Sequence, residues 1–161
     1  MAGIDHFLKI TGIKGESQDA THKNEIEVRS WSWGLASEAS SGAGGGGAAG
    51  KPTFEDLSIV KRVDRSSPKL AQACATGKHF PEAVLAVRRA GGANFSLDFL
   101  VIKLSDVTIS SYHSSVDETD STAMDSFSIR FAKIRHSYTT QKADGTLDTA
   151  IEWNWDLKLG T

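Results

Sequence analysis

The alternation of apolar and polar residues at every second position constrains this chain more than any other feature of its sequence. From Ile151 to Leu159, apolar residues occupy every odd position and polar or charged residues occupy every even one. Phe127, Ile129 and Phe131 alternate in the same way with polar neighbours. A period of two is typical of β-strands that show one face to a core and the other to a wetter surface. The chain is therefore predicted to be all-β and mainly antiparallel.

Eight segments fit the strand pattern. They are Asp5–Ile10, Glu25–Trp33, Phe54–Val63, Ala83–Arg89, Ser96–Leu104, Val107–His113, Phe127–Ile134 and Ile151–Leu159. In the seventh, Ile134 falls on the opposite parity from Phe131, so a bulge near Ala132–Lys133 is expected. The second and fifth segments are apolar on both parities. Such strands need a second cover, either a neighbouring subunit or the inside of a closed barrel.

One helix of about ten residues is predicted at about 67–76. Ser66 and Ser67 offer a capping hydroxyl, Pro68 suits the first turn, and Gly77 follows the last residue. Cys74 lies in the apolar body of this helix, where a small buried packing residue is expected. Because it is the only cysteine, the chain forms no intramolecular disulfide and no cysteine-based metal site.

Length and charge limit the function classes. The 161 residues fit one domain, 1–161, and 18 basic against 20 acidic residues give a formal charge of −2. That balance argues against a nucleic-acid binder and against a polybasic membrane anchor. The first residues lack the pattern of a secretory signal, and no run of 18 apolar residues occurs. We therefore expect a cytoplasmic product without membrane insertion, unless a signal-independent machine exports it.

A glycine-rich stretch at 36–51 formally matches nucleotide-binding signatures. Gly42, Gly44 and Gly47 satisfy G-x-G-x-x-G, but Pro52 occupies the hydroxyl position that should follow Lys51 in a phosphate loop, and a strand follows in place of a helix. We interpret the stretch as an extended loop that is mobile on its own, with no cofactor.

Other candidate chemistry also lacks a supporting pattern. The five histidines have no metal-ligand spacing. No G-x-S-x-G elbow is present, so an enzyme is not expected. The acidic residues Asp117, Glu118, Asp120 and Asp125 lack the glycine and terminal glutamate of a calcium loop and are interpreted as a solvated loop.

Several motifs, in order along nearly the whole chain, resemble the haemolysin-coregulated proteins, the Hcp family of bacterial type VI secretion. The resemblance is carried by residues 13–22, 25–28, 30–34, 51, 56–58, 64–70, 73–79, 88–92 and 141–145, and by the tryptophan-rich last strand. It implies a β-barrel-like sandwich of two antiparallel sheets with one flanking helix, assembling as a homohexameric ring.

The resemblance also implies a function. Rings of this family stack into the inner tube that a contractile sheath drives out of the cell, with a VgrG-type spike protein at the tip. Family members bind small secreted effectors in the ring lumen, as chaperone and carrier. The chain is thus expected to be a non-enzymatic tube subunit, assembled in the cytoplasm and then secreted.

By the same resemblance, Ser30 and Ser32 are candidates for effector contact in the lumen. Ser40, Gly44, Gly46 and Lys51 are candidates for a loop that reaches an adjacent subunit or ring. Two alternatives remain open: a small all-β ligand-binding protein or enzyme of unknown substrate, and an effector that keeps the tube fold.

Overall fold

The computed structural model describes residues 3–39, 49–89, 97–119 and 121–161. The strands are β1 (Ile4–Ile10), β2 (Ile26–Val28), β3 (Ser30–Ser32), β4 (Leu35–Ala39), β5 (Ala49–Phe54), β6 (Leu57–Arg62), β7 (His79–Arg89), β8 (Asp98–Asp117), β9 (Thr122–Tyr138) and β10 (Ile151–Asp156). The helix α1 spans Ser67–Thr76, as predicted. All strand pairings are antiparallel. The predicted fold class, mainly antiparallel β with one helix, is confirmed.

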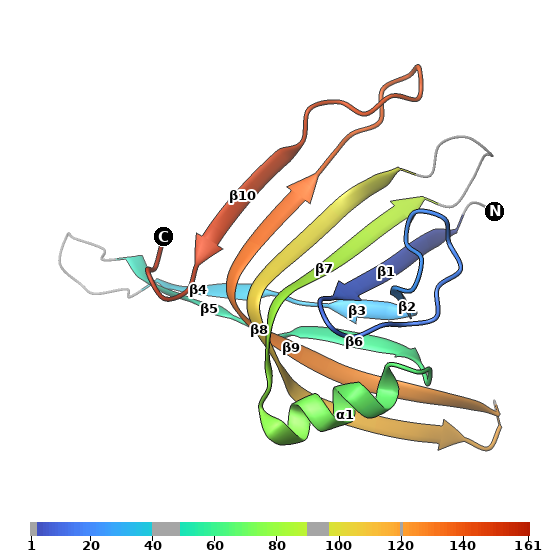
Figure 1. Cartoon of the computed structure of the whole chain (residues 1–161). Helices are drawn as coiled ribbons and strands as arrows, with labels where there is room; N and C mark the ends of the chain where they lie inside the picture. The colour runs from blue at the N-terminus through green and yellow to red at the C-terminus, as the bar shows by residue number, and fades with distance from the viewer. Residues whose placement is uncertain (1–2, 40–48, 90–96, 120) are drawn as a thin grey trace.

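The main sheet curls into a nearly closed barrel (Figure 1). Its strand order is β2-β1-β7-β8-β9-β6-β3, and β10 pairs with the later part of β9. The two edge strands, β2 and β3, are consecutive in the chain and separated only by Arg29, whose N–H donates to the carbonyl of Val60 at 2.8 Å. The two edges of the sheet therefore meet at a seam.

The three long strands β7, β8 and β9 bend sharply at the same level, and we call the line that joins these bends the crease (Figure 1). On one side of it the paired residues Phe80, Val107 and Phe131 are buried, and on the other side the paired residues Ala83, Leu104 and Ile134 are buried. The buried parity thus changes in all three strands at the same level. Asp106, which lies on this line, has φ 51°.

The crease replaces the bulge expected near Ala132–Lys133. Pairing between β8 and β9 stays in register past that point, and the shift lies instead between Ile109 and Ser111. The predicted strands Ser96–Leu104 and Val107–His113 are accordingly one strand, β8. A change of buried face needs no inserted residue when neighbouring strands bend together.

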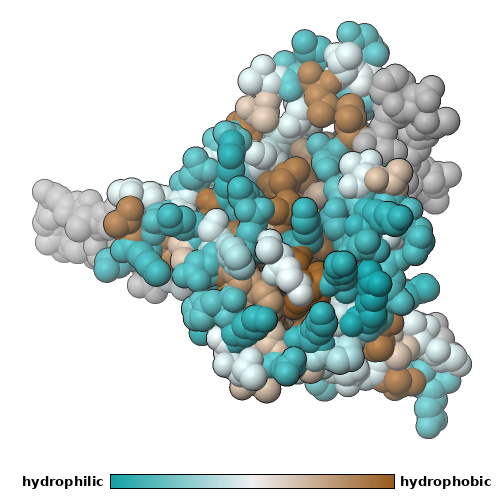
Figure 2. All heavy atoms as spheres, in the orientation of Figure 1, coloured by the Kyte–Doolittle hydropathy of each residue, from teal (hydrophilic) through white to brown (hydrophobic). Residues whose placement is uncertain are grey.

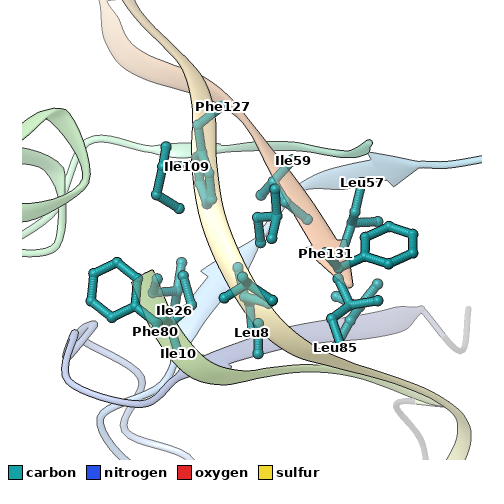
Figure 3. Packing of buried hydrophobic residues seen from close by; sticks show 14 of the residues in the cluster. Leu8, Ile10, Ile26, Leu57, Ile59, Phe80, Leu85, Ile109, Phe127 and Phe131 are labelled. Carbon is teal, nitrogen blue, oxygen red and sulfur yellow. The ribbon is translucent and has the colours of Figure 1, made fainter. Parts of the chain in front are cut away.

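The core lies inside the barrel, between its two walls (Figure 3). Leu8, Ile26, Leu57, Leu85 and Ile129 are among its fully buried side chains. The helix packs on β8 and contributes Leu70 and Ala73.

Two local predictions about the helix have different outcomes. Ser66 makes no side-chain cap to the helix, because its hydroxyl donates to Asp64 instead, so the predicted capping role is wrong. Gly77 closes the helix with φ 65°, as its position predicted. Cys74 is half-buried against the core.

Two predicted strands are divided in the structure. Glu25–Trp33 becomes β2 and β3, because the chain leaves β1 after Val28 and joins β6 at Ser30. Its two apolar parities therefore belong to two strands of one core, and no neighbouring subunit is needed to explain them. Phe54–Val63 is interrupted after Phe54, where the chain passes from β5 into β6.

The glycine-rich stretch is not a loop throughout. Its first and last residues belong to β4 and β5, which pair as a two-stranded sheet separate from the barrel sheet. Ser40, Gly44 and Gly46 lie outside the described residues, and Lys51 is exposed on β5. In the part of the chain that the structure describes, no helix is long and apolar enough to cross a membrane.

Candidate functional site

A row of serines crosses the outer face of four neighbouring strands. Ser32 of β3 pairs with Ser58 of β6, Ser58 with Ser128 of β9, and Ser128 with Ser111 of β8. The neighbours of Ser58 in β6 and of Ser128 in β9 are buried in the core, so these two hydroxyls point away from the barrel interior. We call this set the serine row. It forms a surface of small, uncharged hydrogen-bonding groups.

The β8 end of the serine row is held by hydrogen bonds. Ser110, the extra residue at the register shift, donates to Oδ2 of Asp56 at 2.6 Å. Its Oγ lies 2.7 Å from Oγ of Ser128. Nε of Arg130 lies 3.7 Å from the same Asp56 carboxylate. These contacts fix the orientation of the hydroxyls.

The two serines that the resemblance proposes for the lumen lie on one strand. Ser30 and Ser32 are both exposed on β3, on either side of half-buried Trp31. Lys51 lies in the separate β4–β5 sheet and is not paired with them. The sequence did not identify Ser58 or Ser128, because their adjacency depends on a strand register that no local pattern records.

The two tryptophans of residues 31–33 face the core and contact two histidines. Nε1 of Trp31 donates to Nδ1 of His6 on β1 at 3.0 Å. Trp33 stands edge-on to His136 of β9, with ring centroids 5.6 Å apart. Burial lowers the pKa of His136 and that of His6, although Asp5 partly offsets the effect at His6. Both imidazoles are therefore neutral at pH 7.

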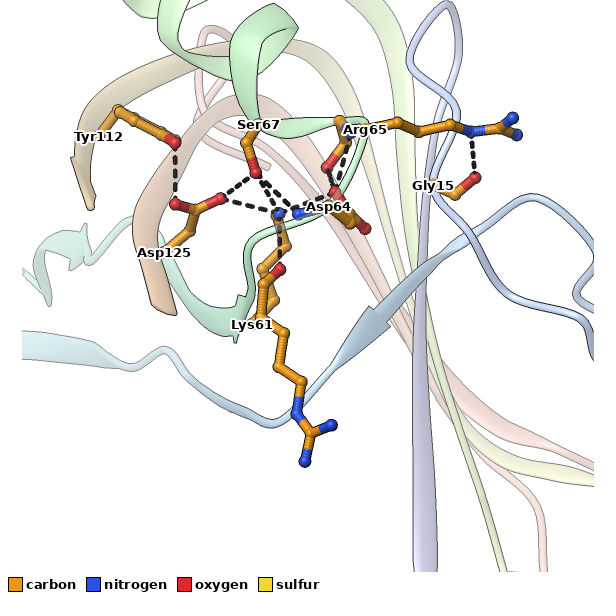
Figure 4. Close-up of polar contacts among 9 residues, drawn as sticks. Gly15, Lys61, Asp64, Arg65, Ser67, Tyr112 and Asp125 are labelled. Carbon is orange, nitrogen blue, oxygen red and sulfur yellow. Dashed lines mark hydrogen bonds and ion pairs between the residues drawn. The ribbon is translucent and has the colours of Figure 1, made fainter. Parts of the chain in front are cut away.

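A buried polar cluster joins the helix to the sheet near the seam (Figure 4). Lys61 and Asp125 are both 0% exposed, and Nζ of Lys61 lies 2.9 Å from Oδ2 of Asp125. Nζ also donates to Asp64 at 3.0 Å and to Ser67 at 3.1 Å, and the hydroxyl of Tyr112 donates to Asp125 at 2.8 Å.

This arrangement corrects the expectation that Asp125 belongs to a solvated loop. Burial alone would raise the pKa of Asp125, but hydrogen bonds from Ser67, Lys61 and Tyr112 outweigh it and hold the pKa below its usual range. The Lys61–Asp125 pair at its centre is fully enclosed, so its role is structural. Among the described residues, no group of three or more His, Cys, Asp and Glu side chains is placed to hold a metal ion.

A surface hollow with a volume of about 550 Å³ lies at the seam. Its walls carry the opposing charges of Glu16, Glu27, Arg29 and Arg62, and none of its lining residues is a nucleophile of the serine or cysteine type. Figure 2 shows a face dominated by hydrophilic residues, with hydrophobic residues gathered in a central hollow and near the upper end. These features differ from the apolar, enclosed pocket typical of a small-molecule site.

An apolar row runs across the upper end of the sheet. Val87, Leu100, Tyr138 and Ile151 are paired in succession from β7 to β10. They continue the core-facing side, but their exposure rises along the row, from 2% at Val87 to 41% at Tyr138 and 73% at Ile151. No described strand or helix forms a second layer over the projecting end of β9 and β10 (Figure 1). We call these four residues the upper apolar row.

Known proteins share this combination of fold and sequence. A family model described as type VI secretion system effector, Hcp, matches residues 7–138. The chain belongs to the Hcp family. It is 40% identical over 156 residues to Protein hcp1 of Pseudomonas aeruginosa, covering 96% of each chain.

Solved structures agree with the family. Hcp1 from Salmonella typhimurium is 32% identical, with a TM-score of 0.76 over 99% of this chain and 97% of that one. A structure described as a type six secretion system protein superposes with a TM-score of 0.90 at 26% identity, covering 99% of both chains. This Hcp protein is thus a type VI secretion protein, from a family that is structural rather than enzymatic.

Proposed function

We propose that this Hcp protein is a structural subunit of the type VI inner tube. It acts as a single domain, forms homohexameric rings that stack, and carries or chaperones small secreted effectors in the lumen. It has no catalytic role. It is assembled in the cytoplasm inside a contractile sheath, capped by a VgrG-type spike, and delivered outside the cell without a signal peptide.

The upper apolar row is the observation that supports the proposed self-assembly most directly. The residues belong to the core-facing side of the sheet, yet the chain's own described residues leave Tyr138 and Ile151 exposed. Burying a large apolar side chain contributes roughly 1.5–3 kcal/mol, so a partner that covers this row gains several kcal/mol per contact. A ring needs such a contact to be heterologous, with this row meeting a different patch on the next subunit.

The serine row supports the carrier role. A lumen that accepts varied cargo needs hydrogen-bonding groups without strong charge or deep pockets, and Ser32, Ser58 and Ser128 provide such a surface. Ser30 extends it along β3. For contacts between rings we propose the paired strands β4 and β5, which carry Lys51, together with Ser40, Gly44 and Gly46 of the sequence between them.

The oligomeric state tests the assembly proposal. We expect light scattering after size exclusion to give a mass near six times 17.3 kDa, and negative-stain images to show open rings. Ile151→Glu should shift the protein toward monomer, because a charge cannot be buried against an apolar partner. Val116→Glu, at a comparably exposed valine at the far end of β8, is the matched control and should keep the ring. A monomeric wild type would favour the ligand-binding alternative.

Native mass spectrometry of rings from the producing bacterium tests the carrier proposal. We expect excess mass that corresponds to bound small proteins. Ser32→Tyr should reduce that excess without dissociating the ring, because a bulky ring blocks the serine row. Thr149→Tyr, exposed on the connection between β9 and β10, should retain the cargo. Equal cargo in both variants would contradict the assignment of Ser32.

A further inference from the structure

The two tryptophans that flank Ser32 each contact a histidine, Trp31 through a hydrogen bond to His6 and Trp33 through its ring against His136. Trp31 donates its indole N–H to Nδ1 of His6 at 3.0 Å. On the other side, Trp153 donates its indole N–H to Nδ1 of His136 at 3.1 Å. Trp33 contacts this second pair, edge-on to the imidazole and stacked on Trp153 at 6.5 Å between centroids.

The contacts of Trp31 and Trp33 join parts of the sheet that share no backbone pairing, whereas Trp153 and His136 are paired residues of β10 and β9. β1 and β3 are not neighbours in the strand order, so the bond between Trp31 and His6 spans the seam. His136 lies on β9, whose neighbours at that level are β8 and β10, so its contact with Trp33 also crosses between the two walls. The segment 31–33 is thus fastened to the opposite wall by both imidazoles.

We propose that His6 and His136 form an acid-sensitive clasp that holds the serine-bearing segment 30–33 against the barrel. Each indole N–H requires an unprotonated Nδ1, which fixes the neutral form with the proton on Nε2. Protonation places an N–H donor against an N–H donor. At His6 this breaks the hydrogen bond of Trp31 across the seam. At His136 it breaks the hydrogen bond that holds Trp153, on which Trp33 stacks, so the segment is loosened at both ends.

The surroundings of the two imidazoles determine the sign of the response. Near His6 the charged groups are Asp5 of β1, Glu27 of β2, Arg88 of β7 and Asp19, all in the hollow on its outer side. Around His136, Arg135 and Glu152 pair with each other on the opposite face of the sheet, and Glu55 lies beside Gly34.

Burial dominates at both sites and lowers both pKa values below 6.5. A histidine with a lowered pKa stabilises the fold above its unfolded pKa, and this contribution is lost as the pH falls from 6.5 through the lowered value. The clasp is therefore closed at pH 7.5 and opens in acid.

Hydrogen exchange of the indole N–H groups, read by NMR on ¹⁵N-labelled protein, tests the clasp. Trp31→Phe and Trp153→Phe assign the two signals. Between pH 7.5 and pH 5 we expect their protection factors, corrected for the intrinsic pH dependence of exchange, to fall roughly tenfold. Imidazole ¹⁵N shifts at pH 7.5 should show an unprotonated Nδ1 in both histidines.

The matched variant is His6→Asn with His136→Asn. The amide oxygen of asparagine takes approximately the position of Nδ1 and cannot be protonated, so protection of both indoles should stay constant with pH. His113→Asn, at an exposed histidine of β8, should keep the wild-type response. If the double variant does not fold, His6→Asn alone should remove the response of Trp31 only. An Nδ1–H form at pH 7.5, or protection unchanged at pH 5, would overturn the proposal.

The consequence for cargo rests on the proposed function. Because Ser30 and Ser32 lie on the clasped segment, rings loaded with effector should release it between pH 7.5 and pH 5, whereas the double asparagine variant should retain it. Rings that carry no cargo at any pH would contradict the carrier proposal and leave the indole result standing.

Discussion

Replacing Lys61 by methionine tests how the helix is attached to the barrel. Met is apolar and of similar length, so the change removes the charge of Nζ and its hydrogen bonds with little loss of volume. Asp125 then stays fully buried with only Ser67 and Tyr112 as partners. Asp64 also loses a cation at 3.0 Å.

The expected cost follows from the enclosure of the pair. Removing one partner of a buried ion pair costs about 3–5 kcal/mol, because the remaining charge has no access to water. A domain of this size is stable by about 5–15 kcal/mol, so Lys61→Met should remove a large part of that margin. Replacing both charges, as in Lys61→Met with Asp125→Leu, should recover most of that loss of about 3–5 kcal/mol, because exchanging a whole buried ion pair for apolar residues is often neutral relative to the intact pair.

Urea denaturation measures the difference. With a slope of about 2 kcal/mol/M, a loss of 4 kcal/mol lowers the midpoint by about 2 M. Lys69→Met, at an exposed lysine of α1, is the control and should change stability by less than about 0.5 kcal/mol. Two protein concentrations should be compared, because assembly adds to apparent stability. A cost below about 1 kcal/mol for Lys61→Met, or a double variant less stable than the single, would refute the reasoning.

Two further predictions concern the N-terminal part of the chain. The hydrogen bond from Arg88 lowers the pKa of Asp19 to about 2, so the contribution of Asp19 to stability is present above pH 4 and is lost as the pH falls toward 2. In thermal melting, Asp19→Asn should therefore be less stable than wild type at pH 7, and the difference should vanish near pH 2. A Cβ on Gly15 would lie 2.4 Å from the carbonyl oxygen of Glu25, so Gly15→Ala should lower the melting temperature by several degrees, whereas Gly3→Ala, with open space around it, should leave it unchanged.

The fold class could be predicted because strand periodicity is a local signal. Ile151 to Asp156 and Phe127 to Phe131 alternate in the sequence and form β10 and part of β9. The division of Glu25–Trp33 into two strands could not be predicted, because it depends on which neighbours are available on each side of Arg29. Strand propensity is a local property and does not record where a segment changes the strand with which it pairs.

The candidate site was predictable only in part. Ser30 and Ser32 came from the family resemblance, and the structure shows them exposed on one strand. The serine row and the buried position of Asp125 needed strand register, since Ser58 and Ser128 are 70 residues apart in the chain. Asp125 is followed by Ser126 in a polar stretch, so its sequence context resembled a surface loop, whereas its partner Lys61 lies on β6.

The crease reverses the tolerance of these strands to substitution along their length. On one side of Asp106, odd positions of β8 such as Val107 and Ile109 must be apolar, and on the other side the even positions Ile102 and Leu104 must be. Removing one residue from β8 alone would therefore turn Lys103 toward the interior of the barrel. Sequence change in this region should be coupled across three strands, with insertions or deletions accepted only as matched sets that keep the line intact.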